Sequence, residues 1–481
     1  MSRIGPLDLS VILLYLAGVT AWGAWLGKGQ KGGSDYFLGN RELPWGAVLL
    51  SVVATETSTL TFLSVPGISY FGTVAFLQLA FGYLIGRIVV ASVLLPAYYR
   101  GRLTTAYELM EIRFGAPVRR FTSGIFMLTR LLADSVRLFA TAIPLALITG
   151  WSFRVSIAVI GAATLIYTYS GGIRAVVWVD VWQMGLYLLG GLAAAALLQA
   201  YVPGGWGSIL SSAASQGKLG LLDPGLDLSR PYTLWAGLIG GACLSMASHG
   251  TDQLIVQRLL TCRDLRSSRK ALVGSGLAVI GQFTLFLALG LGLWAFYGGR
   301  EFARPDEVFA RFIVAELPPG LRGLVIAGVF AAAMSSLSSS LNSLASASTY
   351  DFWEPARGGA ADDRAVLRAG RAFTLVWAGL LVGGAILFIP LSRGTAAVEV
   401  ALGVASLVYG ALLGAFAVAI RAPSVRPRAV MAAMASGIVV VTVLWARHRS
   451  AVAWPWYVPI GGTITYLAGR LSAGFRPASS A

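Results

Sequence analysis

Oxygen-bearing side chains interrupt an apolar run near the start of the chain. The stretch A-T-E-T-S-T-L-T-F, residues 54–62, places Glu56 among five hydroxyl residues inside a hydrophobic segment that extends from Leu43 to Tyr70. A charged side chain within a membrane-spanning segment is costly, so it faces a cavity or a partner and is functional by default. Hydroxyl side chains also compete for backbone hydrogen bonds. We therefore expect this helix to be broken, with carbonyl and hydroxyl oxygens lining a binding site.

Three other polar clusters lie inside apolar segments. They are S-H-G-T-D-Q at 248–253, A-A-A-M-S-S-L-S-S-S-L-N-S at 331–343, and Arg130, Asp134 and Arg137, which the i, i+4, i+7 spacing places on one helical face. Neutral hard oxygens suit an alkali cation such as sodium better than zinc or a redox metal. Two plainer interpretations stay open. Serines in a membrane helix also serve close helix packing, and either arginine could simply neutralise Asp134.

The composition predicts an integral membrane protein. The 481 residues are 56% hydrophobic and 12% charged, with a mean hydropathy of +0.73, whereas about 25% charged residues is usual in soluble domains. Apolar windows of roughly 20 residues, long enough to cross the bilayer, recur along the chain. The net charge of +16 falls in short loops rather than on one basic face, which excludes a nucleic-acid partner. Cys243 and Cys262 have no metal-type spacing.

The hydropathy pattern predicts an all-α protein with about 13 transmembrane helices. The expected spans are 7–27, 44–71, 75–99, 120–149, 154–170, 179–201, 232–257, 271–298, 321–350, 372–390, 396–420, 429–446 and 452–470. Two longer loops, 203–231 and 298–320, have room for short helices.

The distribution of basic residues predicts the orientation. Loops on one side carry about twice as many Lys and Arg residues as loops on the other, and such loops stay in the cytoplasm. This places the N-terminus outside and the C-terminus in the cytoplasm of a cell membrane of the bacterial inner-membrane type. Arg87, Arg130 and Arg137 lie inside spans.

The positions of two clusters predict an internal repeat. The clusters at 54–62 and 248–253 belong to the second and seventh spans, five spans apart, and each contains residues that can leave a helix. Interrupted segments at corresponding places in two halves indicate an inverted-repeat transporter with its site near the bilayer midplane.

Four motifs in order resemble the sodium/solute symporter family, which includes sodium-coupled sugar, proline, sialic acid, iodide and monocarboxylate transporters. The motifs are F-L-S-V-P-G at 62–67, Y-S-G-G-I-R-A-V-V-W-V-D-V-W-Q at 169–183, T-D-Q-L-I-V-Q-R-L-L at 251–260 and I-A-G-V-F-A-A-A-M-S-S-L-S-S-S-L-N-S at 326–343. The resemblance implies a LeuT-type fold of two five-helix inverted repeats in a single transporter domain, residues 1–481. The repeats would be 44–201 and 232–420, with an extra N-terminal helix at 7–27 and two extra C-terminal helices at 429–470.

The resemblance also implies sites for one or two sodium ions. The first site would use the backbone carbonyls of Ala54, Thr57 and Ala332 and the hydroxyls of Ser335 and Ser336. The second, found in some members, would use Asp180, Ser338 and Ser339.

The same comparison leads to a solute with a carboxylate. Sialic acid members place an arginine in the span that here holds Arg137 and Arg130, and a guanidinium suits bidentate carboxylate binding. Sugar-type members carry an aromatic pair where this chain has Ser248 and His249. We expect uptake of a small organic anion by alternating access in a protein that works as a monomer in the lipid bilayer. The other residues expected near the solute are Glu56, Thr61, Asp252 and Gln253.

Two alternatives remain. One is a sodium-coupled sugar or amino-acid symporter of the same fold. The other is a membrane-embedded enzyme, which the sequence disfavours because its two histidines, His249 and His448, have no metal-ligand or nucleophile spacing around them.

Overall fold

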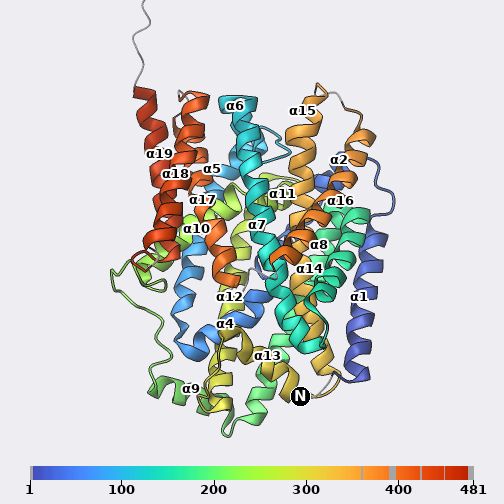
Figure 1. Ribbon diagram of the computed structural model, residues 1–481, viewed down its shortest axis with the longest axis vertical. Coiled ribbons are helices and arrows are strands. Elements are labelled where there is room, and N and C mark those ends of the chain that lie inside the picture. The colour runs from blue at the N-terminus through green and yellow to red at the C-terminus, as the bar shows by residue number, and fades with distance from the viewer. Residues whose placement is uncertain (1–3, 359–360, 389–396, 423–424, 449, 475–481) are drawn as a thin grey trace, which may run out of the picture.

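The chain folds into a bundle of helices that run mostly along one long axis (Figure 1). The computed structural model describes residues 4–358, 361–388, 397–422, 425–448 and 450–474. These residues contain no β-strand, only an isolated backbone bridge between Leu43 and Cys262. The predicted all-α class is therefore confirmed.

Seven of the described helices are long and apolar enough to cross a membrane, and a bent helix pair adds an eighth candidate. The seven are α1 (Pro6–Leu26), α5 (Leu77–Arg100), α8 (Phe153–Tyr201), α12 (Leu265–Tyr297), α14 (Leu321–Ala347), α16 (Asp363–Phe388) and α18 (Pro427–His448).

The remaining helices complete the bundle and its two ends. They are α2 (Gly33–Leu38), η1 (Gly39–Arg41), α3 (Trp45–Glu56), α4 (Thr59–Phe71), η2 (Val74–Phe76), α6 (Glu108–Phe114), α7 (Ala116–Thr149), α9 (Gly205–Ser215), η3 (Ala236–Gly240), α10 (Gly241–Gly250), α11 (Gln253–Leu260), α13 (Pro305–Glu316), η4 (Ser348–Trp353), α15 (Glu354–Ala356), α17 (Ala397–Arg421), η6 (Trp454–Trp456) and α19 (Tyr457–Gly474). Short helices thus occupy both predicted long loops, as α9 and α13. The predicted span end at 390 and span start at 396 lie outside the described residues.

The predicted interruption near Glu56 is present. Helices α3 and α4 meet at 62°. Thr57 adopts an extended conformation, and the side chain of Ser58 caps α4 by accepting a hydrogen bond from the Thr61 N–H at 3.4 Å. Because Ser is a favoured N-cap residue, the local sequence supports a new helix start at this point.

A second break separates α10 from α11. Helix α10 ends at Gly250, and the carboxylate of Asp252 caps α11 by accepting from the Leu254 N–H at 2.9 Å. This interruption also lies where the sequence predicts one. Two broken helices therefore occur at corresponding places in the order of predicted spans.

Helix α8 corrects one predicted boundary. The sequence separates spans 154–170 and 179–201 by a loop, whereas the structure joins them in one 49-residue element with a single non-helical residue, Gly172. Its φ of +52° favours glycine, and a Cβ there would lie 2.4 Å from the Tyr36 carbonyl oxygen. A glycine thus replaces the predicted loop. At about 1.5 Å per residue, the element is far too long for one crossing.

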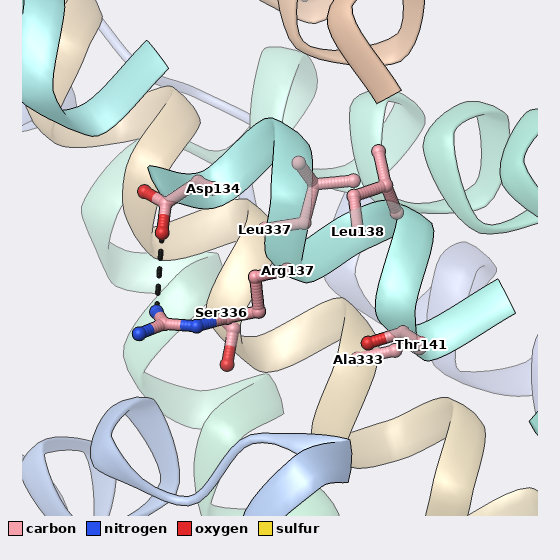
Figure 2. Close-up of a pocket in the computed structure, with 7 residues that line it drawn as sticks. All are labelled: Asp134, Arg137, Leu138, Thr141, Ala333, Ser336 and Leu337. Atoms are coloured by element: carbon pink, nitrogen blue, oxygen red, sulfur yellow. Dashed lines mark hydrogen bonds and ion pairs between the residues drawn. The ribbon is translucent and has the colours of Figure 1, made fainter. Parts of the chain in front are cut away.

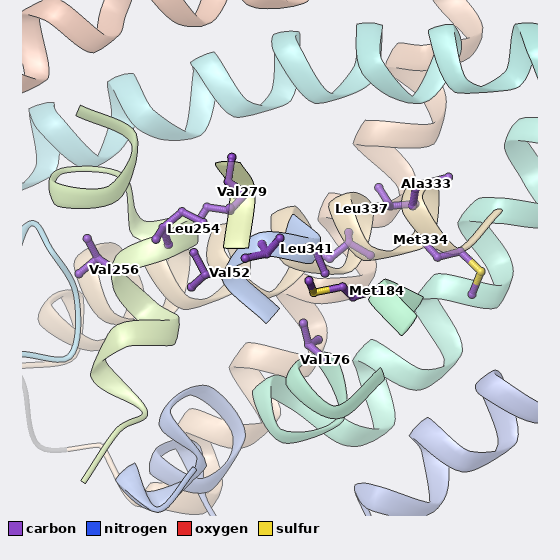
Figure 3. Packing of buried hydrophobic residues seen from close by; sticks show 14 of the residues in the cluster. Val52, Val176, Met184, Leu254, Val256, Val279, Ala333, Met334, Leu337 and Leu341 are labelled. Atoms are coloured by element: carbon purple, nitrogen blue, oxygen red, sulfur yellow. The ribbon is translucent and has the colours of Figure 1, made fainter. Parts of the chain in front are cut away.

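Helix α14 lies at the centre of the bundle, and its described side chains are almost all buried. Figure 3 shows Leu337 and Leu341 of α14 among Val52 of α3, Leu254 of α11 and Val279 of α12. The same apolar core therefore holds both broken helices against α14.

The molecule has two distinct ends. Helix α1 begins at the lower end in Figure 1, where α9 and α13 also lie, whereas α2, α6 and α15 lie toward the upper end. Helix α19 ends at the upper end. An odd number of crossings would produce this arrangement.

Candidate functional site

Two hydrogen bonds position the first helix break against α14. The hydroxyl oxygens of Thr55, in α3, and Ser339, in α14, lie 3.0 Å apart. On the other side of the break, the Thr59 hydroxyl donates to the Val329 carbonyl at 3.1 Å. The segment of α14 between these two contacts contains Ala332, Ser335 and Ser336. The tertiary structure therefore brings both parts of the predicted first sodium site together.

The break frees backbone oxygens on the α3 side. A helix leaves the carbonyls of its last turn without intrahelical donors. The Val53 carbonyl accepts from the Thr57 N–H at 3.0 Å, and the carbonyls of Ala54, Thr55 and Glu56 follow it in this last turn. The Thr57 hydroxyl donates to the Val53 carbonyl at 2.8 Å and accepts from Gln282 at 2.7 Å. Thus Gln282 fixes the Thr57 side chain at the edge of the break.

The α14 side contributes serines in different hydrogen-bonding states. The Ser335 hydroxyl donates to Asp180 Oδ1 at 2.7 Å. The Ser336 hydroxyl is buried and has no hydrogen-bond partner among the described residues. A buried hydroxyl normally has a partner, so the Ser336 oxygen is free to bind a ligand. Helix α14 itself is continuous through Ala332.

Asp180 joins the two predicted sodium sites into one polar cluster. Its carboxylate accepts from Ser335 and from Ser51, the latter at 2.5 Å, and Arg258 Nη2 lies 3.1 Å from its Oδ2 atom. Asp180 and Arg258 have fully buried side chains. Arg258 therefore supplies a fixed positive charge beside the carboxylate, a partner that the predicted second site lacks.

The two serines of the predicted second site differ in their contacts. Ser339 accepts a hydrogen bond from Arg258 and donates to the Ser335 carbonyl at 2.6 Å. Ser338 donates to the same carbonyl at 3.0 Å. The structure places Ser339 within the Asp180 cluster, whereas the Ser338 oxygen retains its acceptor lone pairs.

Arg137 borders a small cavity that is also lined by Ser336, a residue of the predicted first sodium site. Figure 2 shows it near Ser336, with one ion pair to Asp134. Arg137 Nη1 lies 3.1 Å from Asp134 Oδ1, and 22% of its side chain is exposed. A guanidinium has five N–H donors, and this bond uses one of them. Arg137 can therefore neutralise Asp134 and still bind a carboxylate.

Arg130 has a structural role instead. Its Nε donates to Asp252 Oδ2 at 3.1 Å, and its Nη2 donates to both Asp252 and Tyr409. Arg130 Nη1 also lies 3.6 Å from Asp134. Since Arg130 and Asp252 are buried, this pair holds α7 against the second helix break.

Glu56 forms a cluster with two basic side chains. Arg87, which is fully buried on α5, donates to Glu56 Oε2, and His249 Nε2 lies 3.7 Å from the same oxygen. His249 Nδ1 lies 2.8 Å from the Ser248 hydroxyl. Part of the Glu56 side chain remains exposed, at 21%. The structure therefore gathers three predicted solute residues around the end of α3.

The other predicted solute residues are arranged differently. Gln253 accepts from the Ala106 N–H at 2.8 Å and donates to Ser346 at 3.3 Å, so its amide is used inside the fold. Asp252 is fully buried, and its carboxylate is used to cap α11 and to pair with Arg130. Thr61 is partly exposed. Thr61, Glu56, Arg137 and Ser248 therefore offer accessible atoms, whereas Asp252 and Gln253 stabilise the second break.

Three polar residues that bond to the predicted site residues have no predicted role. They are Arg87, Arg258 and Gln282, all buried. Each was detectable as a polar side chain in or next to an apolar span. Their partners were not detectable, because those partners lie on helices distant in the sequence.

Comparison with known proteins gives a consistent result. The model of the sodium:solute symporter family matches residues 36–419. The chain is 28% identical to the sodium/sialic acid symporter NanT of Aliivibrio fischeri over 484 residues, covering 98% of this chain and 93% of that protein. It is 29% identical to human sodium-coupled monocarboxylate transporter 1 over 422 residues, covering 86% of this chain and 68% of that protein.

Solved structures extend this comparison to the fold. A Na⁺-coupled sialic acid symporter in a substrate-bound, outward-open state superposes with a TM-score of 0.89 at 26% identity, covering 98% of both chains. A nucleobase-cation-symport-1 family transporter in a closed conformation shares the fold at 13% identity, with a TM-score of 0.54 over 92% of this chain and 96% of that chain.

Proposed function

Because the chain belongs to the sodium:solute symporter family, we propose that it couples the inward flux of sodium to the uptake of a small organic solute that bears a carboxylate. The related proteins are transporters rather than enzymes, and two of them carry sialic acid or a monocarboxylate, according to their names. The protein is a transporter of the cell membrane. The proposed class of solute is argued from the geometry of the site.

One observation carries the proposal: the contacts Thr55–Ser339 and Thr59–Val329 bracket the helix break and the serines opposite it. These contacts support a site in which carbonyls of the last turn of α3 and the Ser336 hydroxyl would face the same ion. The first sodium ion would bind there, to the oxygens of Ala54, Thr57, Ala332, Ser335 and Ser336.

A second ion would bind beside Asp180. Ser338 and Ser339 would supply hydroxyl oxygens on the α14 side, and Arg258 would remain on the Oδ2 atom of the carboxylate. Two sodium ions with a monoanion would carry one net positive charge inward. The membrane potential then contributes roughly 2.3 kcal/mol per 100 mV to accumulation.

Arg137 would recognise the solute. Its guanidinium borders the cavity that also contains Ser336, so the carboxylate would bind close to the first ion. Coupling follows from this proximity, because a bound cation and a bound anion stabilise one another. Glu56, Thr61, Ser248 and His249 would contact the rest of the solute.

The two broken helices support a fold of two inverted repeats. The repeats would span 44–201 and 232–420 within a single domain and about 13 transmembrane helices, with additional helices at 7–27 and 429–470. The N-terminus would lie outside and the C-terminus in the cytoplasm of a bacterial-type inner membrane. Alternating access would then proceed in a monomer surrounded by lipid.

Uptake into proteoliposomes tests this proposal. Radiolabelled monocarboxylates, sialic acid, sugars and amino acids would be compared under an inward sodium gradient and under a matched potassium gradient. We expect sodium-dependent accumulation of an organic anion only. Sodium-dependent uptake of a neutral sugar or a zwitterionic amino acid, or uptake without sodium, would overturn it.

A further inference from the structure

A second pocket opens at the opposite end of α4 from the helix break. Its volume is about 450 Å³, within the range of roughly 300–1,000 Å³ that is usual for small-molecule sites. It lies between the ends of α4 and α12, the segment after α9 and the loop that follows α12. Its main lining residues are Tyr70, Phe71, Lys218, Trp294, Arg300 and Phe302.

Aromatic rings form the walls of this pocket. The ring centroids of Tyr70 and Phe302 lie 5.5 Å apart in an edge-to-face arrangement, and those of Tyr70 and Phe71 lie 5.2 Å apart. The Tyr70 hydroxyl donates to the Arg300 carbonyl at 2.6 Å. This bond fixes the loop after α12 to α4, so this side of the pocket has a defined position.

Lys218 gives the pocket a fixed positive charge. Its Nζ atom donates to the carbonyls of Tyr70 at 2.7 Å, Gly72 at 3.1 Å and Ser69 at 3.3 Å, which uses all three of its N–H donors. It also lies 5.2 Å from the ring centre of Trp294. Lys218 thus attracts an anion electrostatically and has no N–H left to bind one.

Arg300 has the free donors that Lys218 lacks. Its guanidinium lies 5.8 Å from the ring centre of Phe302, and no carboxylate among the described residues forms an ion pair with it. Arg230, another exposed arginine, pairs with Asp223. Glu301 also lines the pocket. The charged side chains of the lining are therefore two basic ones, Lys218 and Arg300, and one acidic one.

We propose that this pocket binds a small carboxylate with an apolar body. Arg300 would bind the carboxylate in bidentate fashion. The aromatic rings would contact one side of the apolar body, and the charge of Lys218 would attract the anion. The site is separate from the one at Arg137. The pocket would also hold the transported solute before that solute reaches the site at Arg137, and this role rests on the proposed function. The binding of carboxylates to the pocket does not rest on it.

The test measures binding of 4-bromobenzoate to the purified full-length chain by titration calorimetry in sodium-free buffer. The Arg137→Gln variant serves as the background, so that the central site contributes nothing. We expect binding to persist in this background and to weaken roughly tenfold or more on adding Arg300→Gln, because a charge-assisted hydrogen bond is lost. Arg304→Gln, on the same loop and outside the pocket lining, should leave the affinity within twofold.

Two results would overturn the proposal. One is 4-bromobenzoate binding that Arg300→Gln leaves unchanged or that Arg137→Gln alone abolishes. The other concerns the lipid. If 4-bromobenzoate binds in phosphatidylcholine nanodiscs but not in nanodiscs that contain phosphatidylglycerol, the pocket holds an anionic lipid headgroup. Failure of sodium-dependent uptake would affect neither measurement, so the two proposals fail separately.

Discussion

The guanidinium of Arg258 lies 3.1 Å from the carboxylate of Asp180, and both side chains are fully buried. These residues belong to α11 and α8, 78 positions apart in the chain. Removing one partner of a buried ion pair leaves an uncompensated charge, whereas removing both leaves none. The pair therefore fixes the second helix break to α8, beside the proposed sodium sites, and balances the negative charge of Asp180.

Arg258→Met should lower the free energy of unfolding by roughly 3–5 kcal/mol, measured by thermal unfolding of the purified protein. The double variant Asp180→Asn/Arg258→Met should recover much of this loss, because no buried charge remains unpaired. Arg263→Gln is the matched control, since its pair with Asp264 is exposed and exposed pairs contribute about 1 kcal/mol or less. Equal losses in the single and double variants would contradict the charge-balance argument.

Ser336→Ala should raise the sodium concentration for half-maximal uptake several-fold while leaving thermal stability nearly unchanged. The Ser336 hydroxyl has no hydrogen-bond partner among the residues that the structure describes, so only the proposed ion would lose a ligand. Sodium dependence of uptake in proteoliposomes measures this effect. Ser343→Ala, in the same helix, removes a hydroxyl that donates to the Ser340 carbonyl at 3.1 Å and should retain the normal dependence.

Arg137→Gln should abolish uptake of a carboxylate solute, and Arg137→Lys should restore little of it, because an ammonium group cannot form the planar bidentate contact. Initial uptake rates at saturating sodium measure both effects. Normal transport by Arg137→Gln would assign this arginine to neutralising Asp134 alone.

Uptake should depend on membrane potential if two sodium ions accompany a monoanion. One net charge contributes roughly 2.3 kcal/mol per 100 mV, which corresponds to about fortyfold greater accumulation at 1.4 kcal/mol per tenfold. Potassium diffusion potentials set with valinomycin measure this. Ser338→Ala, which removes a proposed ligand of the second ion, should reduce the voltage dependence. Accumulation unaffected by voltage would indicate one ion per monoanion.

Stability should decrease as the pH rises through the range in which Glu108 ionises. Burial raises the pKa of Glu108 from its ordinary value of 4.5 to about 6, although Arg119 nearby acts to lower it. The folded state therefore binds more protons than the unfolded state between these values, and folding is disfavoured by about 2 kcal/mol above pH 6, at 1.36 kcal/mol per pH unit.

Glu108→Gln should remove this contribution. The amide oxygen can still accept from the Thr104 N–H, as Glu108 does at 3.0 Å. Thermal unfolding compared from pH 4.5 to 7 should show the variant gaining stability relative to the unaltered protein as the pH rises. A constant difference across this range would contradict the shifted pKa.

The sequence by itself determined the membrane class, most helix positions and the two breaks. Apolar length and the placement of Ser58, Gly250 and Asp252 are properties of short segments, so they can be read along the chain. The separation of spans 154–170 and 179–201 was overestimated, because the two helical parts meet directly at a kink at Gly172, whose positive φ a glycine adopts without strain.

Only the tertiary structure decided which charges meet. The sequence placed Arg87, Arg130 and Arg258 in or beside apolar segments, and their partners Glu56, Asp252 and Asp180 lie on other helices. Pairing depends on how the helices are rotated and packed around α14, and hydropathy carries no information on either. The same packing directs Arg130 inward as a structural residue and leaves Arg137, two turns later, with free donors at a cavity.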